Sequence, residues 1–131
     1  MRTSNGSKVV RELGLQDKVH LPGFMIDPSP WFRSADLFVL SSLYEGFGNV
    51  IVEALECGVP VVSTDCPSGP AEILDHGRIG KLVPIRDQES LSRAMTASYF
   101  EEHDRRVLMD RAKDFSIERI SVQYLDYFWS E

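Results

Sequence analysis

The chain has 131 residues, with 14 Lys and Arg against 20 Asp and Glu, which gives a formal net charge of −6 at pH 7. Hydrophobic residues make up 43% and charged residues 26%, a composition typical of a globular chain with room for one domain. The acidic balance argues against general nucleic-acid binding and against a polybasic membrane anchor, because both need an excess of Lys and Arg.

Short apolar runs alternate with helical patterns along the chain. Strands are predicted where apolar runs end at Pro, Gly or Ser, at residues 18–21, 36–40, 60–63 and 81–83. Helices are predicted over residues 7–15, 30–35, 49–57, 69–74, 90–100, 104–114 and 117–129. This alternation predicts an α/β fold in one domain over residues 1–131, with a Rossmann-like parallel sheet and flanking helices. The continuous apolar run at 36–40 is typical of a strand that is buried on both faces.

The amino terminus and the cysteines bear on the compartment. The first residues of the chain include no apolar segment of the secretory type, and no apolar run approaches the ~20 residues that span a bilayer. We therefore expect a cytoplasmic protein, in which Cys57 and Cys66 are reduced thiols without a metal-binding pattern.

The segment after the predicted strand at 36–40 carries the first candidate site. In an open parallel sheet, ligands bind beyond the carboxyl ends of the strands. Gly46 and Gly48 let the backbone approach a ligand closely, and the helix that follows offers free N–H groups and a positive dipole end to a phosphate. Asn49 is a candidate N-cap that could instead contact the ligand. Taken alone, this Gly-x-Gly pattern equally predicts a tight strand-to-helix turn.

Two carboxylates flank that turn. Glu45 precedes the helix and Glu53 lies about one turn inside it, with seven residues between them. An acidic side chain at this place can accept hydrogen bonds from a ribose diol or a sugar hydroxyl. The alternatives are a loop charge near a helix N-terminus for Glu45 and a solvated helix position for Glu53. The apolar neighbours of Glu53 predict a largely buried helix, on which a carboxylate needs a partner.

Several motifs together resemble a known family. Residues 44–55 and 57–65 resemble the E-x7-E core of retaining glycosyltransferases, and residues 68–74 and 80–84 extend the resemblance. The chain is similar, from about Leu13 to its last helices, to the C-terminal, nucleotide-sugar-binding domain of glycosyltransferase family 4, which has the GT-B fold. The resemblance implies that this is a partial domain, because the N-terminal acceptor domain and the first two strands of the C-terminal domain have no counterpart here.

The resemblance also implies roles for individual residues. Glu45 would be the catalytic-site residue that holds donor-sugar hydroxyls, and Glu53 would bind the ribose of the nucleotide. The backbone that meets the donor phosphates and sugar would be that of Gly46, Phe47, Gly48, Asn49 and Val50. The turn with Gly23 and Phe24 would lie near the base.

The activity implied by the resemblance is the transfer of a sugar, with retention, from a nucleotide-diphosphate sugar to a glycan or lipid-linked acceptor in polysaccharide or glycoconjugate biosynthesis. No cofactor or metal is expected, and the sequence has no acidic cluster of metal-binding spacing near the turn. The full-length parent would work in the cytoplasm, with a possible peripheral place at the inner face of the membrane.

Other readings remain open at the level of sequence. The isolated chain is expected to be inactive and to self-associate through an unpaired sheet edge. It could instead be a catalytically inactive module that binds a nucleotide sugar or another chain. A phosphatase-like or regulator-like α/β domain is a third possibility, although no nucleophilic Asp follows a strand.

Overall fold

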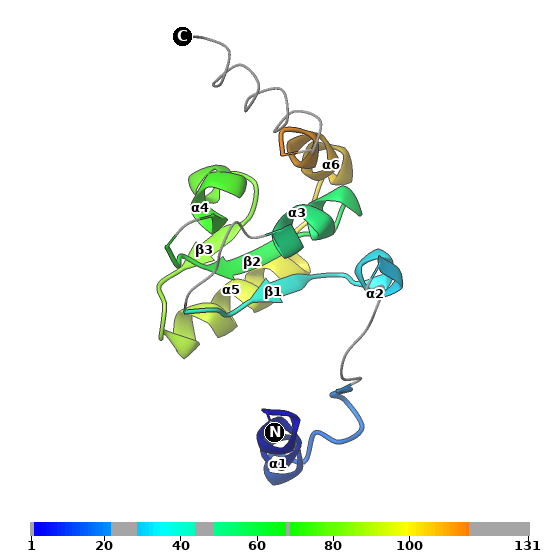
Figure 1. Cartoon of the computed structure of the whole chain (residues 1–131), viewed down its shortest axis with the longest axis vertical. Coiled ribbons are helices and arrows are strands. Elements are labelled where there is room, and N and C mark those ends of the chain that lie inside the picture. The colour runs from blue at the N-terminus through cyan, green and yellow to red at the C-terminus, as the bar shows by residue number, and fades with distance from the viewer. Residues whose placement is uncertain (1, 22–28, 44–48, 68, 116–131) are drawn as a thin grey trace, which may run out of the picture.

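The centre of the molecule is a three-stranded parallel sheet between helices (Figure 1). The computed structural model describes residues 2–21, 29–43, 49–67 and 69–115. The strands are β1 (Phe38–Leu40), β2 (Val61–Thr64) and β3 (Lys81–Val83), in the spatial order β1-β2-β3. All four residues of the central strand β2 are buried, as expected of a strand with neighbours on both sides.

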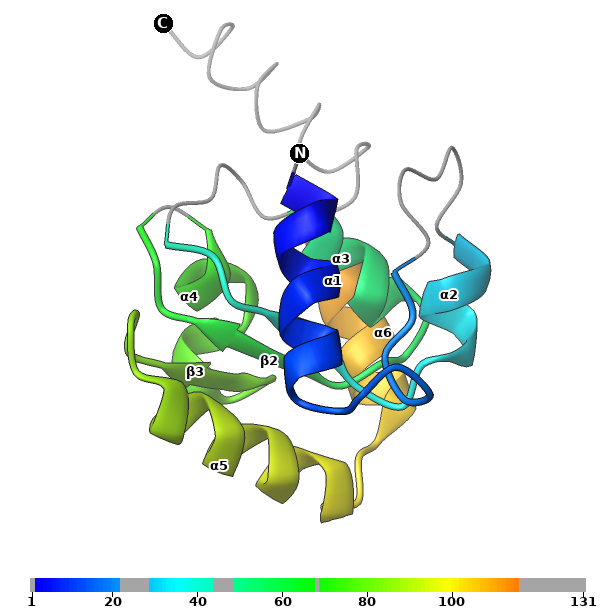
Figure 2. The same ribbon diagram turned by 90° about the horizontal axis from the view of Figure 1, so that it is seen from below.

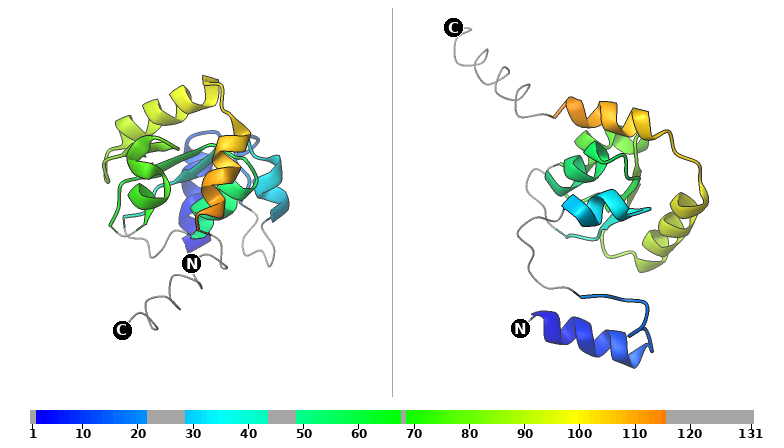
Figure 3. Two further views of the ribbon diagram at one scale, coloured as in Figure 1. Left: turned by 90° about the horizontal axis from the view of Figure 1, so that it is seen from above. Right: turned by 90° about the vertical axis from the view of Figure 1, so that its right-hand side faces the viewer.

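Helices cover both faces of this sheet. Their bounds are α1 Arg2–Glu12, α2 Ser29–Ser34, α3 Asn49–Glu56, α4 Pro70–Ile73, α5 Gln88–Phe100 and α6 Arg105–Lys113, with a 3-10 turn at Asp75–Gly77. Helix α5 packs on β2 and β3 from one side, and α3, α4 and α6 lie on the other (Figure 3). Right-handed crossovers between parallel strands place helices in this way.

Local signals set several helix ends. Asp87 caps α5, because its carboxylate accepts a hydrogen bond of 2.9 Å from the Ser90 N–H. Asp104 caps α6 by accepting from the Arg106 N–H at 3.0 Å. Gly58 follows α3 with φ 70°, a left-handed conformation that ends helices and favours glycine.

The core lies between the sheet and the layer of α3, α4 and α6. Its buried members are Ile51, Val52, Ala54, Leu55, Val59, Val61, Ile73, Leu74, Leu108 and Ala112. Phe38 and Leu40 pack against this cluster from β1. Gly80 is required by the tight packing, because a Cβ there would lie 2.7 Å from the Val61 carbonyl oxygen.

Residues 2–21, here called the N-terminal arm, lie apart from the sheet (Figures 1 and 3). Seen from below, α1 lies in front of the rest of the molecule (Figure 2). The arm meets the body where the His20 ring stacks on the Trp31 ring of α2, with centroids 5.6 Å apart. The apolar side chains of Val9 and Leu13 are exposed on α1.

The predicted fold class is confirmed, and so are most elements. The strand predicted at 81–83 matches β3, and the other predicted elements within the described residues shift by a few residues, apart from the strand at 18–21. That strand is wrong: these residues form a turn and an irregular segment, because no described strand lies beside them to complete a ladder. The strand predicted at 36–40 begins only at Phe38 and is half-buried rather than buried on both faces. The helix predicted at 117–129 lies outside the described residues.

Candidate functional site

The three parallel strands end at one edge of the sheet, where the sequence places the candidate site. Leu40 pairs with Ser63 and Thr64 pairs with Val83, so the carboxyl ends of all three strands lie side by side. The chain leaves β1 through residues 41–43 and re-enters the described part of the structure at Asn49, where α3 begins. The predicted Gly turn therefore connects a strand end with a helix start at this edge.

Thr64 fixes the point at which the chain leaves β1. Its side-chain hydroxyl donates a hydrogen bond of 2.5 Å to the Ser42 carbonyl and reaches the Leu40 carbonyl at 3.5 Å. Thr64 is only 4% exposed, so its hydroxyl needs a hydrogen-bond partner. Thr64 was not predicted to have a role, although a polar residue that ends a buried apolar run is the signal that could have revealed it.

One face of helix α3 is buried and another is exposed to solvent. Ile51, Val52, Ala54 and Leu55 are buried, whereas Glu53 is exposed. Glu53 was predicted to be buried, and this prediction is wrong, because its position falls on the stripe of α3 that faces solvent. Glu53 lies four residues after Asn49, so the two positions share a helix face that begins at the carboxyl edge of the sheet. The Glu53 side chain is therefore accessible to solvent.

The remaining predicted site residues divide into two groups. Asn49 and Val50 form the first turn of α3, and Val50 is half-buried. The others lie outside the described residues: Gly23, Phe24, Glu45, Gly46, Phe47 and Gly48. Their roles at the phosphates, the sugar and the base stay predictions.

The segment after β2 forms the next part of this edge. The Asp65 N–H donates to the Val83 carbonyl at 2.7 Å, and the residue itself is exposed. Cys66 is 3% exposed and packs as a small apolar side chain. Gly69 has φ 135° and precedes Pro70, the first residue of α4, which is a favourable start for a helix. Asp65 directly follows β2, so the expectation that no Asp stands at the end of a strand is wrong, and its carboxylate is exposed.

Two features of the described residues bear on ligands and membranes. No group of three or more His, Cys, Asp or Glu in this part of the chain could hold a metal ion. No helix in the same residues is long and apolar enough to cross a bilayer. The expectation that the site needs no metal stays a prediction.

Comparison with known proteins identifies the family. Residues 3–99 match the family described as Glycosyl transferases group 1. The chain belongs to this family. The match spans the Gly turn, α3 and all three strands, so the candidate site lies inside the matched region.

Individual relatives agree with this assignment. The lipopolysaccharide core biosynthesis glycosyltransferase LpsE from Rhizobium meliloti is 34% identical over 97% of this chain and 38% of its own length. The N-acetylgalactosamine-N,N'-diacetylbacillosaminyl-diphospho-undecaprenol 4-alpha-N-acetylgalactosaminyltransferase from Campylobacter jejuni is 31% identical over 80% of the chain and 29% of its own length. The chain thus spans about a third of the length of these relatives.

A solved structure shows the same fold. The structure of HepE from Anabaena in complex with UDP is 26% identical and superimposes with a TM-score of 0.81 over 98% of this chain and 37% of that one. The fold is therefore a Rossmann-like part of a GT-B glycosyltransferase.

Proposed function

We propose that this chain is the donor-binding part of a retaining glycosyltransferase of family 4, which moves a sugar from a nucleotide-diphosphate sugar to a glycan or lipid-linked acceptor. The observation that carries the proposal is the family match over residues 3–99, which includes both glutamates of the E-x7-E pattern and the helix that holds the second. The activity belongs to polysaccharide or glycoconjugate biosynthesis and uses no metal or cofactor.

The local geometry supports this division of roles. Glu53 is exposed on the face of α3 that begins at the carboxyl edge of the sheet, so its carboxylate is available to a ribose diol. The N-terminal turn of α3 offers backbone N–H groups and the positive end of the helix dipole to the donor phosphates. Glu45, one loop earlier, would hold hydroxyls of the donor sugar.

The relatives support the ligand classes in the proposal. HepE was crystallised with UDP, which makes a nucleoside diphosphate the first ligand to test. The Campylobacter jejuni relative acts, by its name, on a diphospho-undecaprenol substrate, which supports a lipid-linked acceptor. We propose that the longer protein meets this acceptor at the inner face of the membrane. The 131 residues span about a third of such relatives, and we propose that they transfer little or no sugar alone.

Substitution of the two glutamates tests the assigned roles in the longest form of the protein that binds UDP. Glu53→Gln should weaken binding of both UDP and a UDP-sugar, because the ribose is common to both ligands. Glu45→Gln should weaken only the UDP-sugar. Loss of a charge-assisted hydrogen bond costs roughly 1.5–3 kcal/mol, about tenfold to a hundredfold in Kd, which titration calorimetry resolves.

Glu56→Gln is the matched control for this experiment. Glu56 is an exposed residue of α3 and lies one turn further from the start of the helix, so the substitution removes the same charge at a greater distance from the edge. Binding of both ligands should be unchanged in this variant. Equal losses for both ligands in both glutamate variants would refute the separate roles, and unchanged binding in both would remove the glutamates from the site.

A further inference from the structure

A small polar pocket lies at the amino-terminal edge of the sheet, opposite the strand ends that carry the candidate site. Its volume is about 110 Å³, and its walls come from the starts of β2 and β3, the turn before β3, and the segment at the end of α5. The charged and polar side chains among its lining residues are Arg78, Lys81, Ser98, Glu101 and His103. All lining residues fall within the range 60–103, so the pocket is formed at the β2–β3 side of the sheet rather than at β1.

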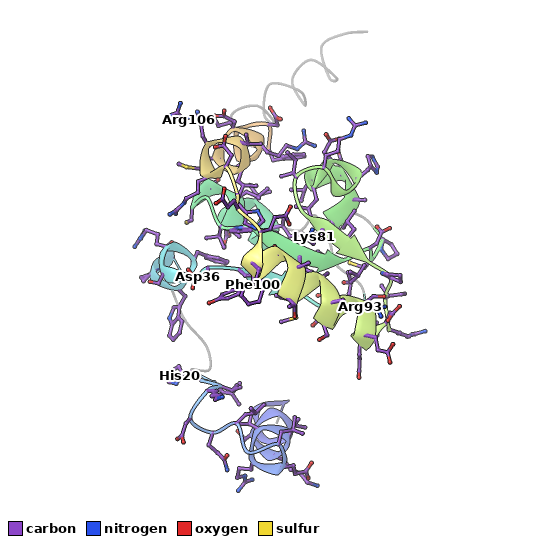
Figure 4. All side chains as sticks on the ribbon, turned by 180° about the vertical axis from the view of Figure 1, so that it is seen from behind. His20, Asp36, Lys81, Arg93, Phe100 and Arg106 are labelled. Carbon is purple, nitrogen blue, oxygen red and sulfur yellow. The ribbon has the colours of Figure 1, made fainter. Side chains whose placement is uncertain are left out.

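Lys81 places a partly shielded positive charge at this pocket. Its Nζ, on the residue labelled in Figure 4, lies 3.0 Å from Oε2 of Glu101, which follows the last residue of α5. The Lys81 side chain is 35% exposed, so salt screens its charge less than that of a fully exposed lysine. An ammonium group has three N–H donors, so the pair with Glu101 leaves donors for a second acceptor.

His103 adds a second, fixed donor group to the wall. Its Nε2 lies 2.7 Å from the Ser98 carbonyl and 3.5 Å from the Ser98 hydroxyl. A carbonyl oxygen only accepts, so Nε2 carries the hydrogen and Nδ1 is the nitrogen that can gain a proton. Ser98 is only 2% exposed, which holds the imidazole ring in place against the end of α5.

Arg78 lies at the rim and is free to turn towards the pocket. Its side chain is 83% exposed and contacts Asp75 at 3.9 Å, an exposed ion pair that contributes little to stability. The described lining residues thus offer two permanent positive charges and one imidazole against a single carboxylate. This local excess stands out in a chain whose formal net charge is −6.

We propose that this pocket binds a single phosphate group. Arg and Lys are the usual protein ligands of phosphate, because their N–H groups form charge-assisted hydrogen bonds with its oxygens. The volume lies well below the roughly 300 Å³ at which sites for larger organic ligands begin, so a phosphate fits and a nucleotide does not. The pocket is at the edge opposite the donor site, and failure of this proposal leaves the proposed transferase function untouched.

An NMR titration of the longest form of the protein that folds tests the site. Sodium phosphate is the probe, and sodium chloride keeps the ionic strength constant. Saturable shifts are expected in the backbone amide signals of Lys81, Ser98 and His103. Shifts confined to Asn49 and Val50 would instead locate the ion at the start of α3 and overturn the proposal.

Two substitutions at the Lys81–Glu101 pair should act in opposite directions. Lys81→Met should raise the Kd for phosphate about tenfold or more, because it removes a charge-assisted hydrogen bond. Glu101→Gln should lower the Kd, because it removes the negative charge that repels the anion. If Lys81→Met fails to fold, Arg78→Met takes its place, since Arg78 lies in an exposed turn, and it should also raise the Kd.

Lys113→Met is the matched control for Lys81→Met. Lys113 is also a lysine paired with a carboxylate, at 3.4 Å from Oδ1 of Asp110, but it is the last residue of α6 and does not line the pocket. Its substitution should leave the Kd unchanged. Absence of saturable shifts, equal loss of affinity in both lysine variants, or weaker binding by Glu101→Gln would each overturn the proposal.

Methyl phosphate, used as a second probe, identifies the source of the phosphate group. Binding as tight as that of inorganic phosphate would show that the pocket accepts phosphate esters, whose organic part stays in solvent. Weaker binding would assign the enclosed volume to the free ion.

Discussion

Arg111 of α6 should be a main source of stability for α4, and Arg111→Met tests this. Its Nε donates to the Ile73 carbonyl at 2.9 Å, and its Nη2 donates to the Glu72 carbonyl at 2.7 Å. Both carbonyls belong to the last turn of α4, where helix carbonyls have few partners within the helix, although the Leu74 N–H also contacts the Glu72 carbonyl. A helix of four residues cannot offset its own nucleation cost, so contacts such as these must hold it in place.

The size of the effect follows from the burial of each group. The Arg111 side chain is 22% exposed, and its guanidinium also lies 4.9 Å from the centre of the Phe115 ring. The carbonyl of the fully buried Ile73 would lose its charged partner, at a cost of about 1–3 kcal/mol. The Glu72 carbonyl belongs to an exposed residue and can bond to water instead. We expect Arg111→Met to lower the free energy of unfolding by about 2–3 kcal/mol.

Arg106→Met is the control for this measurement. Arg106 lies on the same helix, is exposed, and points away from the body in Figure 4, so the substitution changes charge and side-chain type equally. Its effect should remain within about 0.5 kcal/mol. Urea denaturation followed by circular dichroism gives both values. A difference between the two variants below about 0.5 kcal/mol would show that Arg111 does not hold α4.

Two further predictions concern packing and pH. Gly80→Ala should lower the free energy of unfolding by about 1–3 kcal/mol, because its Cβ would lie 2.7 Å from the Val61 carbonyl oxygen. Gly6→Ala meets only an ordinary 3.7 Å contact and should not lower it, and equal urea midpoints for the two variants would contradict the packing argument. The pKa of Asp87 lies below its ordinary value of 3.8, mainly because its carboxylate accepts a hydrogen bond from the Ser90 backbone N–H and, to a smaller extent, because it accepts one from the Ser90 hydroxyl. The ionised cap therefore stabilises the fold above that pH, and this stabilisation is lost as the pH falls through the lowered pKa. Asp87→Asn keeps a capping oxygen that does not titrate. The free energy of unfolding of this variant, measured from about pH 5 to 2, should therefore fall less steeply than that of the natural chain. Parallel curves for the two proteins would exclude this contribution.

The elements with local signals could be predicted from the sequence. Gly58 marks the end of α3, Asp104 marks the start of α6, and the structure confirms both as helix boundaries. A strand has no such local signal, because its hydrogen bonds belong to a neighbour. Residues 18–21 and 36–40 were both predicted to be strands, but only the second segment lies beside β2 and forms one.

The candidate site could be predicted in part. The position of the Gly turn, between a strand end and a helix start, followed from the alternation of elements. The exposure of Glu53 did not follow from the sequence. Four buried residues in one short helix suggest that the whole helix is buried, whereas a helix that packs on a sheet keeps one face in solvent. The hydrogen bond from Thr64 to the Ser42 carbonyl was also missed, because it joins residues 22 positions apart that only the parallel pairing brings together.

That hydrogen bond connects the candidate site with the sheet edge. The loop that holds Glu45 starts from residues 41–43, and Thr64 fixes this start through the Ser42 carbonyl. The other end of the loop is fixed by α3, whose Ile51 and Leu55 are fully buried in the core. Both anchors depend on β2, since Thr64 ends that strand and α3 packs on it. The end of β1 and the start of α3 thus hold the two ends of the loop that carries Glu45.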